Sequence, residues 1–234
     1  MAAIWAVLVA AGSGQRMGAG IPKQYLQLAG RKVIEHSLDA LVQCPSIDGI
    51  YLVVSHDCDL WLDLDLEHNK PVHVVYGGKE RAHSVVTALE CLSPLHPADT
   101  WALVHDAARP CVSEVLLETL IAQLADDPVG GLLAIPVQDT LKQVVAGRVE
   151  RTLDRTLVWQ AQTPQMFRLG VLQNAYRMAL EKGLTPTDEA LAVEIAGHSP
   201  RLVEGNVDNL KITRPEDLAL AEFILRRRQE GVRS

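Results

Sequence analysis

Short apolar runs alternate along this chain with segments whose apolar residues recur at helical spacing. The run from Ile4 to Ala11 is continuous, as in a strand buried on both faces, and residues 33–42 then repeat apolar positions at helical spacing. Similar runs follow at 49–55, 72–76, 101–105 and 129–137, and helical patterns at 80–93, 113–126, 168–182, 187–197 and 214–229. This alternation predicts an α/β fold with a doubly wound, mostly parallel, Rossmann-like sheet that binds ligands at the carboxyl ends of its strands.

One segment, residues 138–162, breaks the alternation. DTLKQVV, a short Ala-Gly turn and RVERTL are typical of a two-stranded β-hairpin that is rich in charge and has little core of its own. Because an isolated hairpin is marginally stable in water, we expect this one to pack on another surface. The length of 234 residues suits a single domain, 1–234, from which 138–162 protrudes as an arm.

Charge and cysteine content narrow the class of protein. The chain has 22 Lys and Arg against 29 Asp and Glu, and the net charge of −7 argues against a general binder of nucleic acid or anionic membranes. The four cysteines are far apart and form no C-x-x-C pair, so neither a zinc site nor a disulfide framework is indicated. The apolar start lacks the basic residues of a targeting signal and is too short to span a bilayer. We therefore expect a cytoplasmic protein.

The first predicted strand runs into a glycine-rich loop, LVAAGSGQRMGAGIPK, at residues 8–23. A dinucleotide-binding fingerprint would need glycine at Met17, and a Walker loop would need lysine after Gly18, so neither motif fits. Backbone N–H groups uncovered by side chains form a nest for phosphate oxygens, and Arg16 and Lys23 add two cations. The loop thus indicates a polyphosphate ligand, such as a nucleoside triphosphate.

The loop belongs to the first of several sequence blocks that occur in order along the chain. The blocks are AAGSGQRMG with PKQY, GGKERAHSV, VHDAARP, TPQ, TDEA and DNLKITRPEDL. Together they resemble the 2-C-methyl-D-erythritol 4-phosphate cytidylyltransferase family, whereas the first block alone indicates only the wider nucleotidyltransferase superfamily. The resemblance implies transfer of a cytidylyl group from CTP to the methylerythritol phosphate, release of pyrophosphate, a Mg²⁺ cofactor, and a role in the non-mevalonate isoprenoid pathway. It also implies a homodimer in which the 138–162 arm crosses to the second subunit.

The resemblance assigns roles to individual residues. The catalytic pair would be Arg16 and Lys23. The nucleotide would be bound by Ala10, Ala11, Gly12, Gly14, Gly77, Gly78 and Ser84. The polyol phosphate would be bound by Arg109, Thr140, Arg155, Thr163, Thr187 and Lys211. Asp106 directly follows the run WALVH, at a predicted carboxyl end, where an oxygen ligand suits Mg²⁺; Asp208 is a candidate second metal contact, for which a turn or capping role is equally expected.

Two other functions remain open on the sequence alone. A cytidylyltransferase for another polyol phosphate, such as ribitol 5-phosphate, would share the CTP-binding blocks, and only residues 138–190 could separate the two. A non-catalytic nucleotide-sensing protein would be expected to have lost Arg16, Lys23 or Asp106, and this chain keeps all three. The histidines have no paired carboxylate or ligand spacing, so we expect His105 to be structural.

Overall fold

A seven-stranded sheet runs through the described part of the chain, which in this computed structural model comprises residues 2–12 and 21–231. Its strands, in spatial order, are β11 (Arg201–Glu204), β7 (Gly130–Pro136), β10 (Trp159–Arg168), β6 (Trp101–Asp106), β1 (Ile4–Val9), β4 (Gly49–Val54) and β5 (Val72–Tyr76). β10 is antiparallel to β6 and β7, and the other neighbouring pairs are parallel. The predicted mostly parallel α/β sheet is confirmed.

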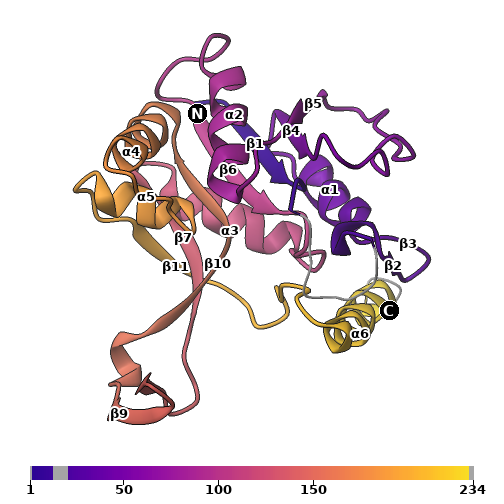
Figure 1. The fold of residues 1–234 in the computed structure, drawn as a ribbon. Coiled ribbons are helices and arrows are strands. Elements are labelled where there is room, and N and C mark those ends of the chain that lie inside the picture. The colour runs from indigo at the N-terminus through magenta and orange to yellow at the C-terminus, as the bar shows by residue number, and fades with distance from the viewer. Residues whose placement is uncertain (1, 13–20, 232–234) are drawn as a thin grey trace.

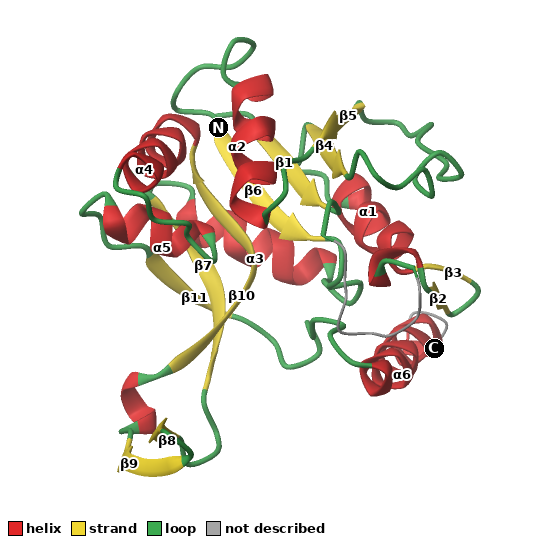
Figure 2. Cartoon of the chain, viewed as in Figure 1, coloured by secondary structure: helices red, strands yellow, loops and turns green. Residues whose placement is uncertain are grey.

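Helices cover both faces of the sheet (Figure 2). α1 (Val33–Gln43) and α3 (Glu114–Leu124) pack on one face, and α2 (Arg81–Leu92), α4 (Leu169–Glu181) and α5 (Glu189–Ile195) pack on the other. The side chains of β1 alternate between the two cores, since Ala6 and Leu8 join the first and Val7 joins the second. This two-sided burial explains why β1 reads as an unbroken apolar run.

A third, smaller core lies beside the sheet and binds distant segments together. α6 (Pro215–Gly231) packs against the region that holds the 3-10 helix η2 (Lys23–Tyr25) and the short strands β2 (Gln27–Leu28) and β3 (Arg31–Lys32). The shared buried residues are Leu28, Val33, Cys111, Ile212, Ala221 and Ile224. Within the described residues, no helix is both long and apolar enough to cross a membrane.

The predicted hairpin is present as β8 (Lys142–Val145) and β9 (Arg148–Thr152), followed by the 3-10 helix η3 (Arg155–Leu157). Figure 1 shows it extending away from the sheet, carried by the ends of β7 and β10. β10 begins at Trp159, within the predicted arm segment 138–162, and leads from the hairpin back into the sheet. β10 was not among the predicted strands, since the buried polar residues of QAQTPQMF mask its apolar pattern.

Candidate active site

The carboxylate of Asp106 stands at the carboxyl end of β6, next to the end of β1, where Val9 pairs with it in register. Asp106 is buried, and its oxygens accept hydrogen bonds from Arg81 Nε (2.9 Å) and Lys211 Nζ (2.6 Å). Burial alone raises the pKa of a carboxyl group, but the positive charges of Arg81 and Lys211 outweigh it and hold the pKa of Asp106 well below its usual range. Asp106 is therefore an ionised carboxylate at the sheet edge.

The guanidinium of Arg81 is held on its other side by Glu189. Its two terminal nitrogens donate to the two Glu189 oxygens at 2.7 and 3.0 Å, and Tyr176 Oη donates to Glu189 Oε1 at 2.9 Å. Burial lowers the pKa of Arg81, but Glu189 and Asp106 more than compensate and raise it. Arg81 and Glu189 were not predicted from the sequence, although they lie inside the blocks GGKERAHSV and TDEA. The available signal was a positively charged residue in one block and a negatively charged residue in the other.

A cavity of about 180 Å³ opens beside Asp106. Its lining residues are Arg81, Asp106, Arg109, Ala161, Gln162, Thr163, Gln165, Thr187, Asp188 and Lys211. Five residues predicted from the sequence thus meet here: Asp106, Arg109, Thr163, Thr187 and Lys211. These five residues come from four separate segments of the chain. Three cationic side chains line the cavity, those of Arg81, Arg109 and Lys211, and its volume is enough for a phosphate group and a few neighbouring atoms.

Arg109 is the most deeply buried cation among the predicted phosphate contacts, with 9% of its surface exposed. Its NH1 donates to Asn209 O at 2.7 Å, whereas its Nε is buried and has no acceptor among the described residues. Burial lowers the pKa of Arg109 more than the neighbouring Asp106 raises it. A buried guanidinium with an unpaired N–H is stabilised by an anion, so this position suits a phosphate oxygen.

His105 and Thr163 hold the backbone at Asp106 and Arg109 in place through hydrogen bonds. Thr163 Oγ1 accepts from the Asp106 N–H (3.0 Å) and lies 3.1 Å from His105 Nδ1, while His105 Nε2 lies 3.1 Å from Arg109 O. Because a carbonyl only accepts, Nε2 carries the ring proton and Nδ1 accepts from the Thr163 hydroxyl. Burial lowers the pKa of His105 to about 4, so the ring is neutral at pH 7, as expected of a structural histidine.

Most of the described residues predicted to bind the nucleotide follow the ends of β1 and β5, and Ser84 lies in the first turn of α2. A Cβ on Gly77 would lie 2.5 Å from Ser84 Oγ and 2.8 Å from the Ala11 Cβ, so only glycine allows these two strand ends to approach. Ser84 is buried and its hydroxyl lies 3.3 Å from Gly78 O and 3.2 Å from Glu80 O. In this arrangement Ser84 holds the turn that follows β5.

Gln24, which the sequence reasoning overlooked, fixes the other side of this edge. It is buried, and its amide donates to Ala10 O and, at 2.9 Å, to Gly12 O. Lys23 Nζ donates to Ile212 O at 2.6 Å, next to Lys211. The predicted residues Gly14 and Arg16 lie outside the described residues.

Two predicted polyol-phosphate contacts and one predicted metal contact lie apart from the cavity. Thr140 and Arg155 are exposed at the arm, where the Arg155 guanidinium donates to Gln138 O. Asp208 is paired with Arg227 of α6. Among residues 2–12 and 21–231, no group of three or more His, Cys, Asp or Glu side chains is arranged to hold a metal ion, so any metal at Asp106 would take most of its ligands from substrate and water.

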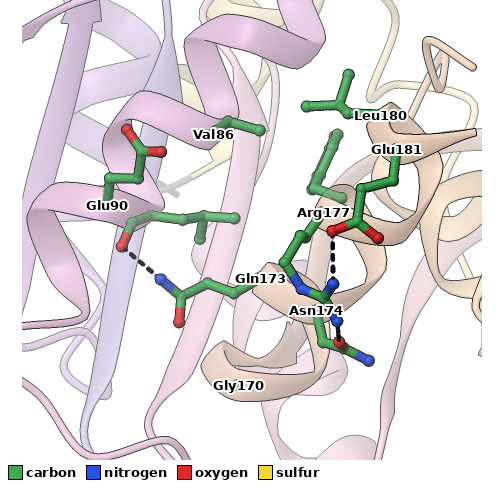
Figure 3. A pocket seen from close by; sticks show the side chains of 10 residues that line it. Val86, Glu90, Gly170, Gln173, Asn174, Arg177, Leu180 and Glu181 are labelled. Atoms are coloured by element: carbon green, nitrogen blue, oxygen red, sulfur yellow. Dashed lines mark hydrogen bonds and ion pairs between the residues drawn. The ribbon is translucent and has the colours of Figure 1, made fainter. Parts of the chain in front are cut away.

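A second cavity of about 760 Å³ lies between α2 and α4 (Figure 3). Its cation, Arg177, is engaged by Glu181 at 2.7 Å and by Asn174 at 2.6 Å on the same helix, and Gln173 donates to Leu89 O. The contacts of Arg177 are thus surface pairs along α4, and Gln173 joins α4 to α2. The smaller cavity at Asp106, which gathers cations from several segments, is the better phosphate site.

Comparison with known proteins agrees with this geometry. Residues 4–227 match the family described as 2-C-methyl-D-erythritol 4-phosphate cytidylyltransferase (IspD). An enzyme of that name from Pseudomonas putida is 51% identical over 218 residues, which cover 92% of this chain and 93% of the relative. Another from Ectopseudomonas mendocina is 53% identical over 217 residues, 92% of each chain.

Solved structures give the same result. A crystal structure of a 4-diphosphocytidyl-2C-methyl-D-erythritol synthase superposes with a TM-score of 0.83 at 35% identity and covers 96% of this chain and 99% of its own. The Francisella tularensis 2-C-methyl-D-erythritol 4-phosphate cytidylyltransferase also gives 0.83, at 36% identity over 95% of this chain and 100% of its own.

Proposed function

The chain belongs to the 2-C-methyl-D-erythritol 4-phosphate cytidylyltransferase family, and we propose that the cavity beside Asp106 is where its reaction takes place. The enzyme transfers a cytidylyl group from CTP to 2-C-methyl-D-erythritol 4-phosphate in isoprenoid biosynthesis. A phosphate oxygen of the acceptor bonds to the α-phosphorus of CTP, the bond from that phosphorus to the bridging oxygen breaks, and pyrophosphate leaves. Since a phosphate nucleophile needs no proton removed, the chain acts by positioning and by stabilising charge.

The acceptor phosphate is bound by Arg109, Lys211, Thr163 and Thr187. The observation that carries this assignment is that all four residues line the same small cavity beside Asp106. Lys211 spends one of its three N–H donors on Asp106 and keeps two for a phosphate oxygen. A fork-shaped donor, an ammonium group and hydroxyls are the groups that a phosphate dianion prefers.

The residues at the sheet edge fit one Mg²⁺ ion. Mg²⁺ is usually held by one or two carboxylates together with substrate phosphates and water, and Asp106 is an ionised carboxylate beside the phosphate cavity. When bound, Mg²⁺ neutralises charge on the phosphate oxygens. Asp106 would be its ligand from the chain, with Asp208 as a second candidate only if Asp208 leaves its pairing with Arg227.

The triphosphate is bound by the loop after β1. Lys23 and Arg16 stabilise the charge that develops on the α-phosphate and on the leaving pyrophosphate. The cytidine of CTP would lie at the ends of β1 and β5, where Ala10, Gly12 and Gly77 present backbone with little side chain over it. These roles extend the family's reaction to named residues of this chain.

The active enzyme is a homodimer in which each arm completes the partner's site. Supporting this, the arm leaves Val144, Val145, Val149 and Leu157 exposed, and a ribbon with so little core gains stability by covering such residues with a second copy. Arg155 and Thr140 would then contact the methylerythritol phosphate of the partner subunit.

Pyrophosphate release from a panel of nucleoside triphosphates and polyol phosphates tests the proposed site. We expect CTP with the methylerythritol phosphate to turn over far faster than ATP or GTP with the same acceptor, because the family to which the chain belongs transfers a cytidylyl group. Equal turnover with purine triphosphates would contradict the nucleotide assignment, and equal turnover with ribitol 5-phosphate would contradict the acceptor assignment.

A further inference from the structure

Four side chains from four elements form one buried chain of polar contacts that ends at the cavity. Tyr176 on α4 donates to Glu189 on α5, Glu189 accepts from Arg81 on α2, and Arg81 donates to Asp106 on β6. Only Arg81 and Asp106 line the cavity. We propose that Glu189, held by Tyr176, is a positioning residue of the reaction, which fixes the plane of the Arg81 guanidinium so that Arg81 in turn fixes the carboxylate of Asp106.

The geometry of Arg81 supports this proposal. A guanidinium is planar, so once both terminal nitrogens are bonded to the Glu189 oxygens, at 2.7 and 3.0 Å, the direction of the Nε–H bond is set as well. That bond reaches Asp106 Oδ1 at 2.9 Å. Without the Glu189 clamp, the guanidinium could rotate to take both Asp106 oxygens or turn into the cavity.

Glu189 is itself fixed on several sides. It is fully buried, with 0% of its surface exposed, and Tyr176 is 1% exposed. The first turn of α5 is tied to β10, because Gln165 accepts from the Ala190 N–H at 2.8 Å and donates to Asp188 at 3.0 Å. Glu189 therefore has a fixed backbone as well as a fixed carboxylate.

Charge balance explains why this residue is acidic. Arg81 and Lys211 carry two positive charges, and Asp106 and Glu189 carry two negative charges. Glu189 therefore balances the charge of Arg81, and Asp106 balances that of Lys211. An apolar residue at 189 would leave the guanidinium of Arg81 without its bidentate partner, and removing one member of a buried ion pair is strongly destabilising.

The proposal rests on the role proposed above for Asp106 and predicts a specific kinetic pattern. Glu189→Gln keeps the shape of the side chain but removes its negative charge and one of the two oxygens that accept hydrogen bonds from Arg81. We expect kcat to fall by roughly 10- to 100-fold, the usual range for a residue that orients a catalytic group, with KM for both substrates changed by less than about threefold. Glu181→Gln is the matched control, because it breaks an exposed Arg–Glu pair on α4 and should leave both constants unchanged (Figure 3).

A spectroscopic measurement on the substrate-free enzyme is independent of turnover. In the NMR spectrum of the ¹⁵N-labelled protein, the Arg81 Nε–H signal should exchange slowly with water in the wild type and in Glu181→Gln, and faster in Glu189→Gln. Tyr176→Phe removes only the hydroxyl group that donates to Glu189. We therefore expect a smaller rise in the exchange rate of the Arg81 signal and a smaller fall in kcat, of about threefold to tenfold.

The outcomes separate this proposal from the one on which it rests. If Asp106→Asn stays active, the role of Asp106 is wrong; if Asp106→Asn is inactive while folded Glu189→Gln keeps wild-type kcat, the positioning role of Glu189 is wrong. A lower melting temperature with unchanged kcat and an unchanged Arg81 signal would likewise overturn the proposal. Should Glu189→Gln fail to fold, Tyr176→Phe decides in the same way.

Discussion

The buried residues around Asp106, here called the Asp106 centre, differ from the β8–β9 arm in whether their side chains find partners within one chain. At the centre, Asp106, Glu189 and His105 are buried and all have partners within the chain. On the arm, Val149 is 61% exposed and Leu157 is 81% exposed. The comparison shows that the proposed catalytic edge is held in place by contacts within one chain, whereas the arm leaves apolar side chains exposed that a second surface would cover.

The largest effect should come from the centre. Asp106→Asn removes the charge between Arg81 and Lys211 and the proposed Mg²⁺ ligand, so we expect kcat to fall by roughly three orders of magnitude in a pyrophosphate-release assay. Asp208→Asn should cost much less if Asp208 only pairs with Arg227. A well-folded Asp106→Asn enzyme with near wild-type turnover would contradict the assignment of the centre.

Lys23 should come next. Lys23→Ala removes a cation from the proposed triphosphate site, and we expect kcat to fall by roughly two orders of magnitude with a smaller change in KM for CTP. The matched control is Lys70→Ala, since Lys70 also donates to a backbone carbonyl, that of Cys44, but lies away from the cavity. If the two variants behave alike, Lys23 has only a structural role.

The pH dependence of stability should also distinguish the two regions. Burial lowers the pKa of His105 from 6.5 to about 4, so between these values the unfolded chain binds more protons, and the free energy of unfolding falls as the pH falls. This contribution is about 3 kcal/mol in full. It is present above pH 6.5, and His105→Gln should flatten the curve between pH 6.5 and 4 in urea titrations.

The arm contains no histidine, so no imidazole on the arm contributes to that slope. A His105→Gln protein with the wild-type slope over this interval would show that His105 does not supply it.

The smallest effect on folding should come from the arm itself. Leu157→Ala should change the free energy of unfolding of the monomer by less than about 0.5 kcal/mol, whereas Leu103→Ala, at a fully buried position of β6, should cost about 2–5 kcal/mol. Leu157→Ala should instead raise the dissociation constant of the dimer in sedimentation experiments. An unchanged dissociation constant would argue that the partner does not cover Leu157.

The sequence predicted the sheet well, because parallel strands buried on both faces, such as β1 and β6, read as continuous apolar runs. It did not predict β10, whose buried residues include Gln162, Thr163 and Gln165. Those polar side chains are satisfied by contacts far along the chain, such as Gln165 with Asp188, and no local pattern reveals such partners.

The same limit applies to the site. Residues at strand ends, such as Asp106, were predictable because the carboxyl edge of the sheet gathers them. Arg81 and Glu189 were not, since their pairing joins positions 108 residues apart and depends on how α2 and α5 meet over the sheet. Spacing within a block indicates which residues bind a ligand, but the residues that hold those in place become visible only in three dimensions.

Subunit mixing tests most directly whether the centre of one chain is completed by the arm of the other. Arg155→Ala and Lys211→Ala homodimers should each be nearly inactive, mainly through a raised KM for the methylerythritol phosphate. After subunit exchange, each mixed dimer has one site with both lesions and one with neither, so an equimolar mixture should regain about one quarter of wild-type activity. A mixture that stays inactive after demonstrated exchange would mean that each site is built within one chain.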